Sequence, residues 1–145
     1  MSNFIDQRLS YHFISDGDPH AFKNTVMKLN PATTLFIITS KSFTTKETLY
    51  NAKAAFRWLG RQDEIDKHFI AVTENSKGAQ EFGINNILPI WNWVGGRYSL
   101  CSAVNLITAI AIGFEQFSEL LAGAHSMDQH FKKRRLKEIY LYYSP

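Results

Sequence analysis

The chain has 145 residues, of which 45% are hydrophobic and 20% are charged, and its formal net charge is +3. This length suffices for one domain with a hydrophobic core, and the composition excludes an intrinsically disordered protein. The longest apolar stretch, residues 100–114, is interrupted by polar residues and is shorter than the roughly 20 residues of a bilayer span. We therefore expect no membrane segment, and residues 1–11 lack the apolar core of a secretory signal.

The positive charge is concentrated at the end of the chain. Residues 132–145 contain five Lys or Arg residues against one Glu, which leaves the remaining residues slightly acidic. The basic run contains no interleaved aromatic residues, so we expect a solvated segment and no nucleic-acid partner. The single cysteine, Cys101, excludes an intramolecular disulfide and is interpreted as a core thiol in a reducing cytoplasm.

Runs rich in β-branched and aromatic residues alternate with helical patterns along the chain. In order, they predict strand 11–15, helix 19–29, strand 34–39, helix 44–59, strand 68–73, helix 77–82, strand 88–93, and helices 98–112 and 114–122. Thr44 and Glu47 are predicted to form a capping box on the second helix, and Gly60 to end it. The alternation predicts right-handed β-α-β crossovers and an α/β fold with a mainly parallel sheet.

The segment Ser40–Thr45 lies between a predicted buried strand and a predicted helix, and it carries four hydroxyl groups and Lys41. At the carboxyl end of a parallel strand, the next helix presents unpaired N–H groups and the positive end of its dipole. Phosphate is a suitable ligand for such a loop, and the absence of a GxxxxGK[ST] pattern argues against a nucleotide P-loop. An ordinary cluster of N-cap residues is the alternative, and spacing alone leaves both interpretations open.

A second polar constellation, Gly95-Gly96-Arg97, follows the last predicted strand. Consecutive glycines allow a positive φ angle or the close approach of a ligand. Arg97 stands at a predicted helix start on the same sheet edge as Ser40–Thr45, where its guanidinium could stabilise an oxyanion. The alternative is a tight turn with Arg97 paired to a surface carboxylate. Two anion-binding loops at one sheet edge favour a site.

Two further patterns are interpreted as structural. Trp91 and Trp93 alternate in the last predicted strand and are expected to fill the core on one face. His125 and His130, with Asp128 between them, are five residues apart and therefore do not share one helical face. No metal site is predicted.

Three segments resemble signatures of the glucose-6-phosphate isomerase (phosphoglucose isomerase) family, in the family's order and approximate spacing: residues 35–49, 91–100 and 120–131. The resemblance covers about residues 11–131. We accordingly expect residues 1–131 to be a fragment of a sugar-isomerase domain and residues 132–145 to be a divergent basic tail. The implied fold is a sugar-isomerase three-layer α/β sandwich with a mainly parallel sheet, here truncated.

The resemblance implies the reversible isomerisation of glucose 6-phosphate and fructose 6-phosphate, a step of glycolysis and gluconeogenesis, through an enediol intermediate. It implies no metal and no organic cofactor, a homodimeric parent enzyme, and a cytoplasmic location. Arg97 would be catalytic, by stabilising the enediolate. The substrate-binding residues would be a glycine that faces the sugar, Gly96, and a set that binds the phosphate: Ser40, Lys41, Ser42 and Thr45. Ser42 stands where the family usually has threonine, and it keeps the hydroxyl group.

The departures from the family pattern concern the rest of its catalytic machinery. The motifs that hold the family's catalytic glutamate, its ring-opening histidine and its catalytic lysine have no counterpart in the sequence. Isomerisation through an enediol requires a base that moves a proton between neighbouring carbons, so the isolated chain is expected to be inactive. The alternatives are a non-catalytic sugar-phosphate-binding module, which would need the Ser40–Thr45 segment but not Arg97, and an inactive remnant with a frameshift near Lys132.

Overall fold

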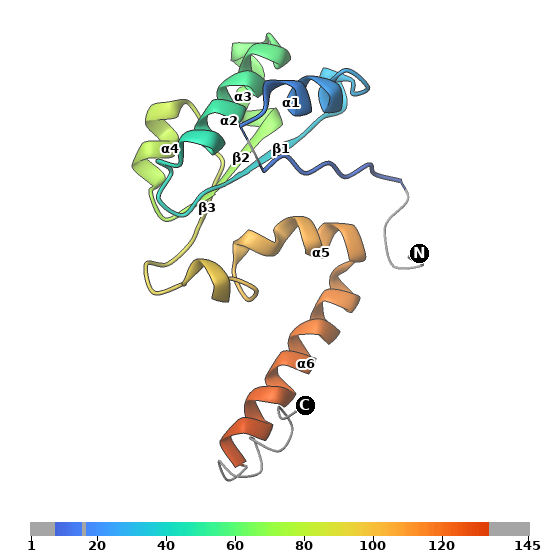
Figure 1. Ribbon diagram of the computed structural model, residues 1–145, viewed down its shortest axis with the longest axis vertical. Helices are drawn as coiled ribbons and strands as arrows, with labels where there is room; N and C mark the ends of the chain where they lie inside the picture. The colour runs from blue at the N-terminus through green and yellow to red at the C-terminus, as the bar shows by residue number, and fades with distance from the viewer. Residues whose placement is uncertain (1–7, 16, 134–145) are drawn as a thin grey trace. The chain divides into compact units, whose positions relative to one another are not determined.

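The computed structural model of the chain describes residues 8–15 and 17–133. The chain divides into two compact units, which are described separately. One unit, Ser10–Ile107, contains the sheet and most of the helices. The described residues of the other unit are 8, 9 and 108–133, most of which form one long helix (Figure 1).

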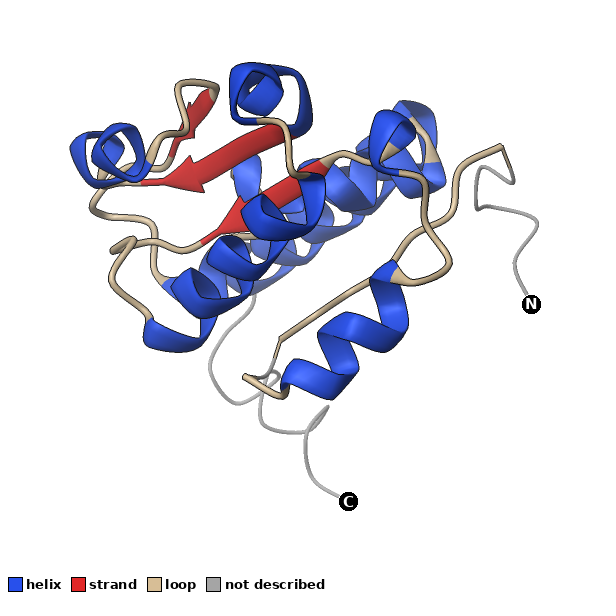
Figure 2. Ribbon diagram, turned by 90° about the horizontal axis from the view of Figure 1, so that it is seen from above, coloured by secondary structure: helices blue, strands red, loops and turns tan. Residues whose placement is uncertain are grey.

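The sheet has three parallel strands in the order β1-β2-β3 (Figure 2). These strands are β1 (Phe36–Thr39), β2 (Phe69–Thr73) and β3 (Ile87–Pro89). Parallel strands require a crossover connection, and here a helix lies in the connection after β1 and in the one after β2. The predicted α/β class with a parallel sheet is confirmed.

The helices are bounded by the capping residues that the sequence supplies. Asp18 accepts a hydrogen bond from the backbone N–H of His20 and so caps the first helix. Gly60 ends the second helix with a φ of 68°, as predicted, and Gly83 ends the fourth with a φ of 103°. The helices are α1 (Pro19–Val26), α2 (Lys46–Leu59), α3 (Ile65–His68), α4 (Ser76–Phe82), α5 (Leu106–Ile112) and α6 (Phe114–Lys133).

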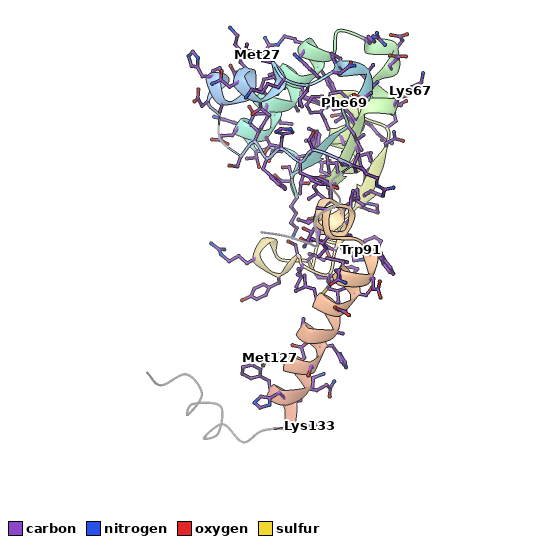
Figure 3. All side chains as sticks on the ribbon, turned by 90° about the vertical axis from the view of Figure 1, so that its right-hand side faces the viewer. Met27, Lys67, Phe69, Trp91, Met127 and Lys133 are labelled. Atoms are coloured by element: carbon purple, nitrogen blue, oxygen red, sulfur yellow. The ribbon has the colours of Figure 1, made fainter. Side chains whose placement is uncertain are left out.

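The hydrophobic core lies between the sheet and the helices α1, α2 and α4. Its centre is Phe69, a fully buried β2 residue that Figure 3 labels. Phe36 stacks on the Phe69 ring at a centroid distance of 5.0 Å, and Phe56 of α2 meets that ring edge-on at 4.4 Å. Ala52 and Ala55 are buried on α2, and their small side chains allow the helix to approach the strands closely.

The opposite face of the sheet is less covered. Because side chains alternate along a strand, Ile37, Ile70 and Leu88 do not share the face of Phe69, and they remain partly exposed. Thr39 is exposed at the end of β1. Val72, which lies on that face, is nevertheless fully buried, so the main core cluster lies on the Phe69 side of the sheet and a smaller buried region lies on the other. Within the described residues, no helix combines the length and the apolar character that a membrane crossing needs.

One predicted element does not form, and a second forms only in part. Residues 11–15 were predicted as a strand, but none of the described strands pairs with them, and a strand without a partner leaves its backbone groups unpaired. The predicted helix 98–112 is broken into two short 3₁₀ turns, and α-helix begins only at Leu106. The hydroxyls of Ser99 and Ser102 donate to the carbonyls of Gly96 and Ser99, which competes with regular helix formation.

Further predictions need correction at the ends of elements. The last strand stops at Pro89, and Trp91 and Trp93 are 54% and 75% exposed instead of filling the core. Cys101 is also exposed and is not a core thiol. Helix α6 continues past the predicted end at residue 122. Gly123 follows that position, and a glycine in a helix interior lowers stability by only about 1 kcal/mol. Residues from 134 onward, which include most of the predicted basic tail, lie outside the described residues.

Candidate functional site

Two loops leave the sheet at the carboxyl ends of its outer strands. The hydroxyl loop, Ser40–Thr45, joins β1 to α2, and the glycine loop, Trp91–Arg97, follows β3. Together they border a pocket of about 150 Å³. Its lining consists of residues from both loops and their neighbours: Thr39, Ser40, Lys41, Ile90, Val94, Gly95, Gly96, Ser99 and Val104. The parallel sheet thus brings the two predicted loops to one edge.

Lys41 links the two loops directly. Its Nζ donates a hydrogen bond of 2.7 Å to the backbone carbonyl of Asn92 in the glycine loop. The same ammonium lies 3.6 Å from a carboxylate oxygen of Glu74, and both side chains are about two-fifths exposed. A positive charge therefore lies between the loops, partly balanced by one carboxylate.

The hydroxyl groups of the hydroxyl loop bond to one another rather than to the helix that follows. The Ser40 and Thr45 hydroxyl oxygens are 3.3 Å apart, and those of Ser42 and Thr44 are 2.7 Å apart. The N-cap residue of α2 is Thr45, and no side chain caps the helix. The predicted capping box of Thr44 and Glu47 is therefore wrong, because both threonine hydroxyls are engaged within the loop.

Phe43 stands at the centre of the hydroxyl loop in a strained backbone conformation. Its φ of 52° lies in the left-handed region, which is uncommon for a residue with a side chain and costs about 1–3 kcal/mol. The ring is only 4% exposed and packs edge-on against Phe82 of α4 at 5.7 Å. Burial of a phenylalanine contributes about 1.5–3 kcal/mol, enough to offset the strain. A core contact therefore holds the loop at its midpoint.

The carbonyl groups of the hydroxyl loop accept hydrogen bonds from the end of β2 and from the connection between β2 and α4. The Lys41 carbonyl accepts hydrogen bonds from the Thr73 hydroxyl and from the backbone N–H of Glu74, both at 3.0 Å. The Ser42 carbonyl accepts one from the Asn75 side-chain amide, also at 3.0 Å. In residues 8–15 and 17–133, the backbone N–H groups of Lys41, Ser42 and Phe43 donate to no acceptor. These N–H groups can therefore bind an anion.

In the glycine loop, the fold itself does not require a glycine at position 96. Neither Gly95 nor Gly96 has a positive φ, so conformational freedom is not what the pair provides here. A Cβ atom added at Gly95 would lie 3.3 Å from the Tyr98 ring, whereas one added at Gly96 would meet nothing within 4 Å. Because Gly96 also lines the pocket, its bare backbone leaves room for a ligand to approach.

The structure brings together part of the predicted set of site residues. Ser40, Lys41 and Gly96 line the pocket; Ser42, Thr45 and Arg97 are exposed beside it and do not. Arg97 lies in a 3₁₀ turn, Gly96–Tyr98, and pairs with no carboxylate in the described part of the chain. The alternative interpretation of Arg97, as one half of a surface ion pair, therefore finds no partner there.

Several residues of the site were not singled out from the sequence. Thr73 and Asn75 were overlooked because their role depends on a loop that lies some 30 residues away. Their local signal is a polar run directly after a buried strand, which predicts a strand end at the same edge. Trp91 and Trp93, which we expected in the core, instead stack on each other at 5.6 Å on the glycine loop.

A metal site was also considered at His125, Asp128 and His130, all of which lie on α6. Among the residues that the structure describes, no group of three or more His, Cys, Asp or Glu side chains is placed to hold a metal ion.

Comparisons with known proteins agree on one family. The family model for phosphoglucose isomerase matches residues 3–139. A glucose-6-phosphate isomerase of Legionella pneumophila (strain Lens) is 61% identical over 130 residues, which are 90% of this chain and 26% of the relative. A glucose-6-phosphate isomerase of Coxiella burnetii (strain RSA 493 / Nine Mile phase I) is 53% identical over 136 residues, 90% of this chain and 25% of the relative.

A solved structure supports the same likeness. The crystal structure of a glucose-6-phosphate isomerase from Chlamydia trachomatis D/UW-3/Cx superposes with a TM-score of 0.70 at 31% identity. The superposition covers 81% of this chain and 23% of that one. The chain thus spans about a quarter of the length of the relatives that it matches.

Proposed function

Because this chain belongs to the phosphoglucose isomerase family, we propose that it binds glucose 6-phosphate or fructose 6-phosphate as part of the enzyme that interconverts them. The observation that carries the proposal is a pocket that both the hydroxyl loop and the glycine loop border. In this proposal the phosphate is bound by Ser40, Lys41, Ser42 and Thr45, and the sugar faces Gly96 and Arg97.

The hydroxyl loop has the chemistry that phosphate requires. Its hydroxyls and its N–H groups are hydrogen-bond donors, and α2 adds the positive end of a helix dipole. The first turn of α2 is free of a side-chain cap, so its N–H groups are also available to an anion. Lys41 adds a positive charge at the edge that faces the glycine loop. These features favour a phosphate over a neutral group.

The proposed role of Arg97 follows from the chemistry of aldose–ketose isomerisation. A proton moves between two neighbouring carbons, and an enediolate with a negatively charged oxygen forms on the way. A guanidinium is always charged, and when it is held beside that oxygen it stabilises the enediolate more than the neutral substrate. Arg97 directly follows Gly96, which lines the pocket, so its backbone lies next to the place proposed for the sugar.

We propose further that the 145 residues do not catalyse the reaction without other protein groups. No residue matches the family's base, and Glu47 is an exposed residue in the first turn of α2. The pocket, about 150 Å³, is also smaller than the roughly 300–1,000 Å³ of typical ligand sites. Both observations favour a site that further residues complete. The family resemblance adds the proposal that the whole enzyme is a cytoplasmic dimer of glycolysis.

Isothermal titration of the purified chain tests the proposal for the phosphate. We expect fructose 6-phosphate to bind and fructose, which lacks the phosphate, to give no measurable heat. Ser42→Ala should weaken binding of fructose 6-phosphate by about three- to tenfold, the value of one hydrogen bond. Thr33→Ala, which removes an exposed hydroxyl outside both loops, is the matched control. Equal binding of the two sugars by a folded chain would refute a phosphate site.

The role of Arg97 needs a ligand that resembles the enediolate. A phosphorylated sugar acid, whose carboxylate imitates the charged oxygen, should lose about 10- to 100-fold in affinity with Arg97→Ala, since hydrogen bonds to charged groups are worth about 1.5–3 kcal/mol. Fructose 6-phosphate should lose less. Arg57→Ala, at an exposed arginine of α2, is the control. Unchanged affinity for both ligands would favour the non-catalytic binding module instead.

A further inference from the structure

We propose that Thr73, the last residue of β2, and Asn75, in the connection between β2 and α4, are positioning residues that hold the hydroxyl loop in its phosphate-binding conformation. The proposal rests on the function proposed above for that loop. Neither residue lines the pocket or belongs to the loop. Both nevertheless contact its backbone through side-chain hydrogen bonds of 3.0 Å.

Thr73 is a fully buried residue whose hydroxyl is used in both directions. The Thr73 hydroxyl donates to the carbonyl of Lys41 and accepts from the backbone N–H of Asn75, each at 3.0 Å. A hydroxyl has one proton to donate, so these two bonds fix its orientation. The N–H of Glu74 donates to the same Lys41 carbonyl. That carbonyl therefore has both of its lone pairs occupied by the β2–α4 connection.

Asn75 uses the two ends of its side-chain amide for different purposes. Its Oδ1 accepts from the backbone N–H of Gly78 at 2.9 Å and caps α4, while its Nδ2 donates to the carbonyl of Ser42. A Cβ atom added at Gly78 would lie 2.6 Å from this Nδ2, although the backbone of Gly78 has no positive φ. The glycine thus leaves the space that the Asn75 amide occupies.

These bonds act on the anion-binding groups through the geometry of the peptide unit. In a planar trans peptide, the C=O of one residue and the N–H of the next point in opposite directions. Holding the carbonyls of Lys41 and Ser42 toward the β2–α4 connection therefore directs the N–H groups of Ser42 and Phe43 away from it. Those two N–H groups have no acceptor in the described residues. The positioning bonds thus fix the direction of two donors that, in this proposal, bind the phosphate.

The test separates the capping role of Asn75 from its positioning role. Asn75→Ser keeps an oxygen that caps α4, because serine is as good an N-cap as asparagine, but it removes the donor to Ser42. Asn30→Ser is the matched control, since Asn30 caps a short 3₁₀ turn through Oδ1 and contacts neither loop. Both variants are made in the 145-residue chain, and melting temperature, loop order and affinity for fructose 6-phosphate are measured.

We expect the two variants to have equal melting temperatures but to differ in the order of the hydroxyl loop. Backbone ¹⁵N order parameters of residues 41–44 should fall from about 0.85 to below about 0.6 in Asn75→Ser and stay unchanged in Asn30→Ser. Affinity for fructose 6-phosphate should fall by about three- to tenfold in Asn75→Ser alone, the value of one hydrogen bond. Unchanged order parameters in a folded Asn75→Ser chain would overturn the proposal.

Threonine variants provide a second, independent arm. Thr73→Val replaces the hydroxyl with a methyl group of similar size, and it should reduce both the order of residues 41–44 and the affinity. Thr73→Ser retains the hydroxyl and should restore both, even though it loses a buried methyl group and some stability. Loss of loop order in Thr73→Ser equal to that in Thr73→Val would show that packing alone is responsible and would overturn the positioning role.

The positioning role and the proposed function fail in different ways. If the unmodified chain is folded but does not bind fructose 6-phosphate, the proposed function fails at that step. The order parameters of residues 41–44 are measured without ligand and still decide whether Thr73 and Asn75 hold the loop. If the chain binds fructose 6-phosphate and the variants leave loop order and affinity unchanged, only the positioning role is wrong.

Discussion

The hydroxyl loop and the glycine loop border one pocket but are held in place in different ways. A buried ring, Phe43, and the side chains of Thr73 and Asn75 hold the hydroxyl loop. The glycine loop is supported mainly by local turns and by the Lys41 ammonium, and its two tryptophans are exposed. The hydroxyl loop is thus anchored in the core through Phe43, whereas the tryptophans of the glycine loop lie on the surface.

The difference indicates that the two loops of the site differ in rigidity. A preorganised group of donors stabilises a charge without rearranging during the reaction, so the loop proposed to bind phosphate benefits from rigid support. A loop with few buried contacts opens at a lower free-energy cost. We therefore expect the glycine loop to open more easily than the hydroxyl loop.

The largest expected effect comes from the anchor of the hydroxyl loop. Phe43→Ala removes a buried ring and leaves the strained backbone without compensation, so we expect a loss of about 3–5 kcal/mol in the free energy of unfolding. Urea denaturation followed by circular dichroism measures it. Phe13→Ala, at a ring that is 75% exposed, should change stability by less than about 0.5 kcal/mol. A loss for Phe43→Ala no larger than that for Phe13→Ala would show that Phe43 does not anchor the hydroxyl loop.

A smaller effect is expected where Lys41 joins the loops. Lys41→Met keeps much of the side-chain stem but removes the donor to Asn92 and the ion pair with Glu74. Stability should fall by only about 0–1 kcal/mol, because the pair is partly exposed, while the order parameters of residues 92–96 should fall. Lys77→Met, which breaks the exposed pair with Glu81, is the control. Unchanged order in residues 92–96 would show that the glycine loop is held by its own turns.

The smallest effect is expected at the exposed tryptophan pair. Trp93→Ala removes a ring that is three-quarters exposed and stacks on Trp91, so we expect a loss of less than about 0.5 kcal/mol. Trp58→Ala, by contrast, removes a ring that packs edge-on against Phe36 beside the core and should cost more. Thermal denaturation compares the two. A larger loss for Trp93 would restore the interpretation of this residue as part of the core.

Much of the fold was predictable because its signals are local. The alternation of apolar runs and helical patterns predicted all three strands of the sheet, and Gly60 ends α2 as expected. The sequence also located both loops of the candidate site, since each follows a predicted strand. The predictions for residues 11–15 and 98–105 relied on the local preference for strand or helix. At 11–15 none of the described strands pairs with the backbone, and at 98–105 serine hydroxyls bond to backbone carbonyls in place of a regular helix.

The sequence alone determined the family, the α/β class and the identity of the two polar loops, because motif order, hydrophobic period and capping residues are properties of neighbouring positions. Tertiary structure decided which groups of those loops are engaged and which are free. Contacts between residues distant in sequence include the bonds from Thr73 and Asn75 to the hydroxyl loop and the bond from Lys41 to Asn92. The strained conformation of Phe43 depends on such a contact as well. Such contacts depend on how strands are ordered in the sheet, and no local pattern encodes them.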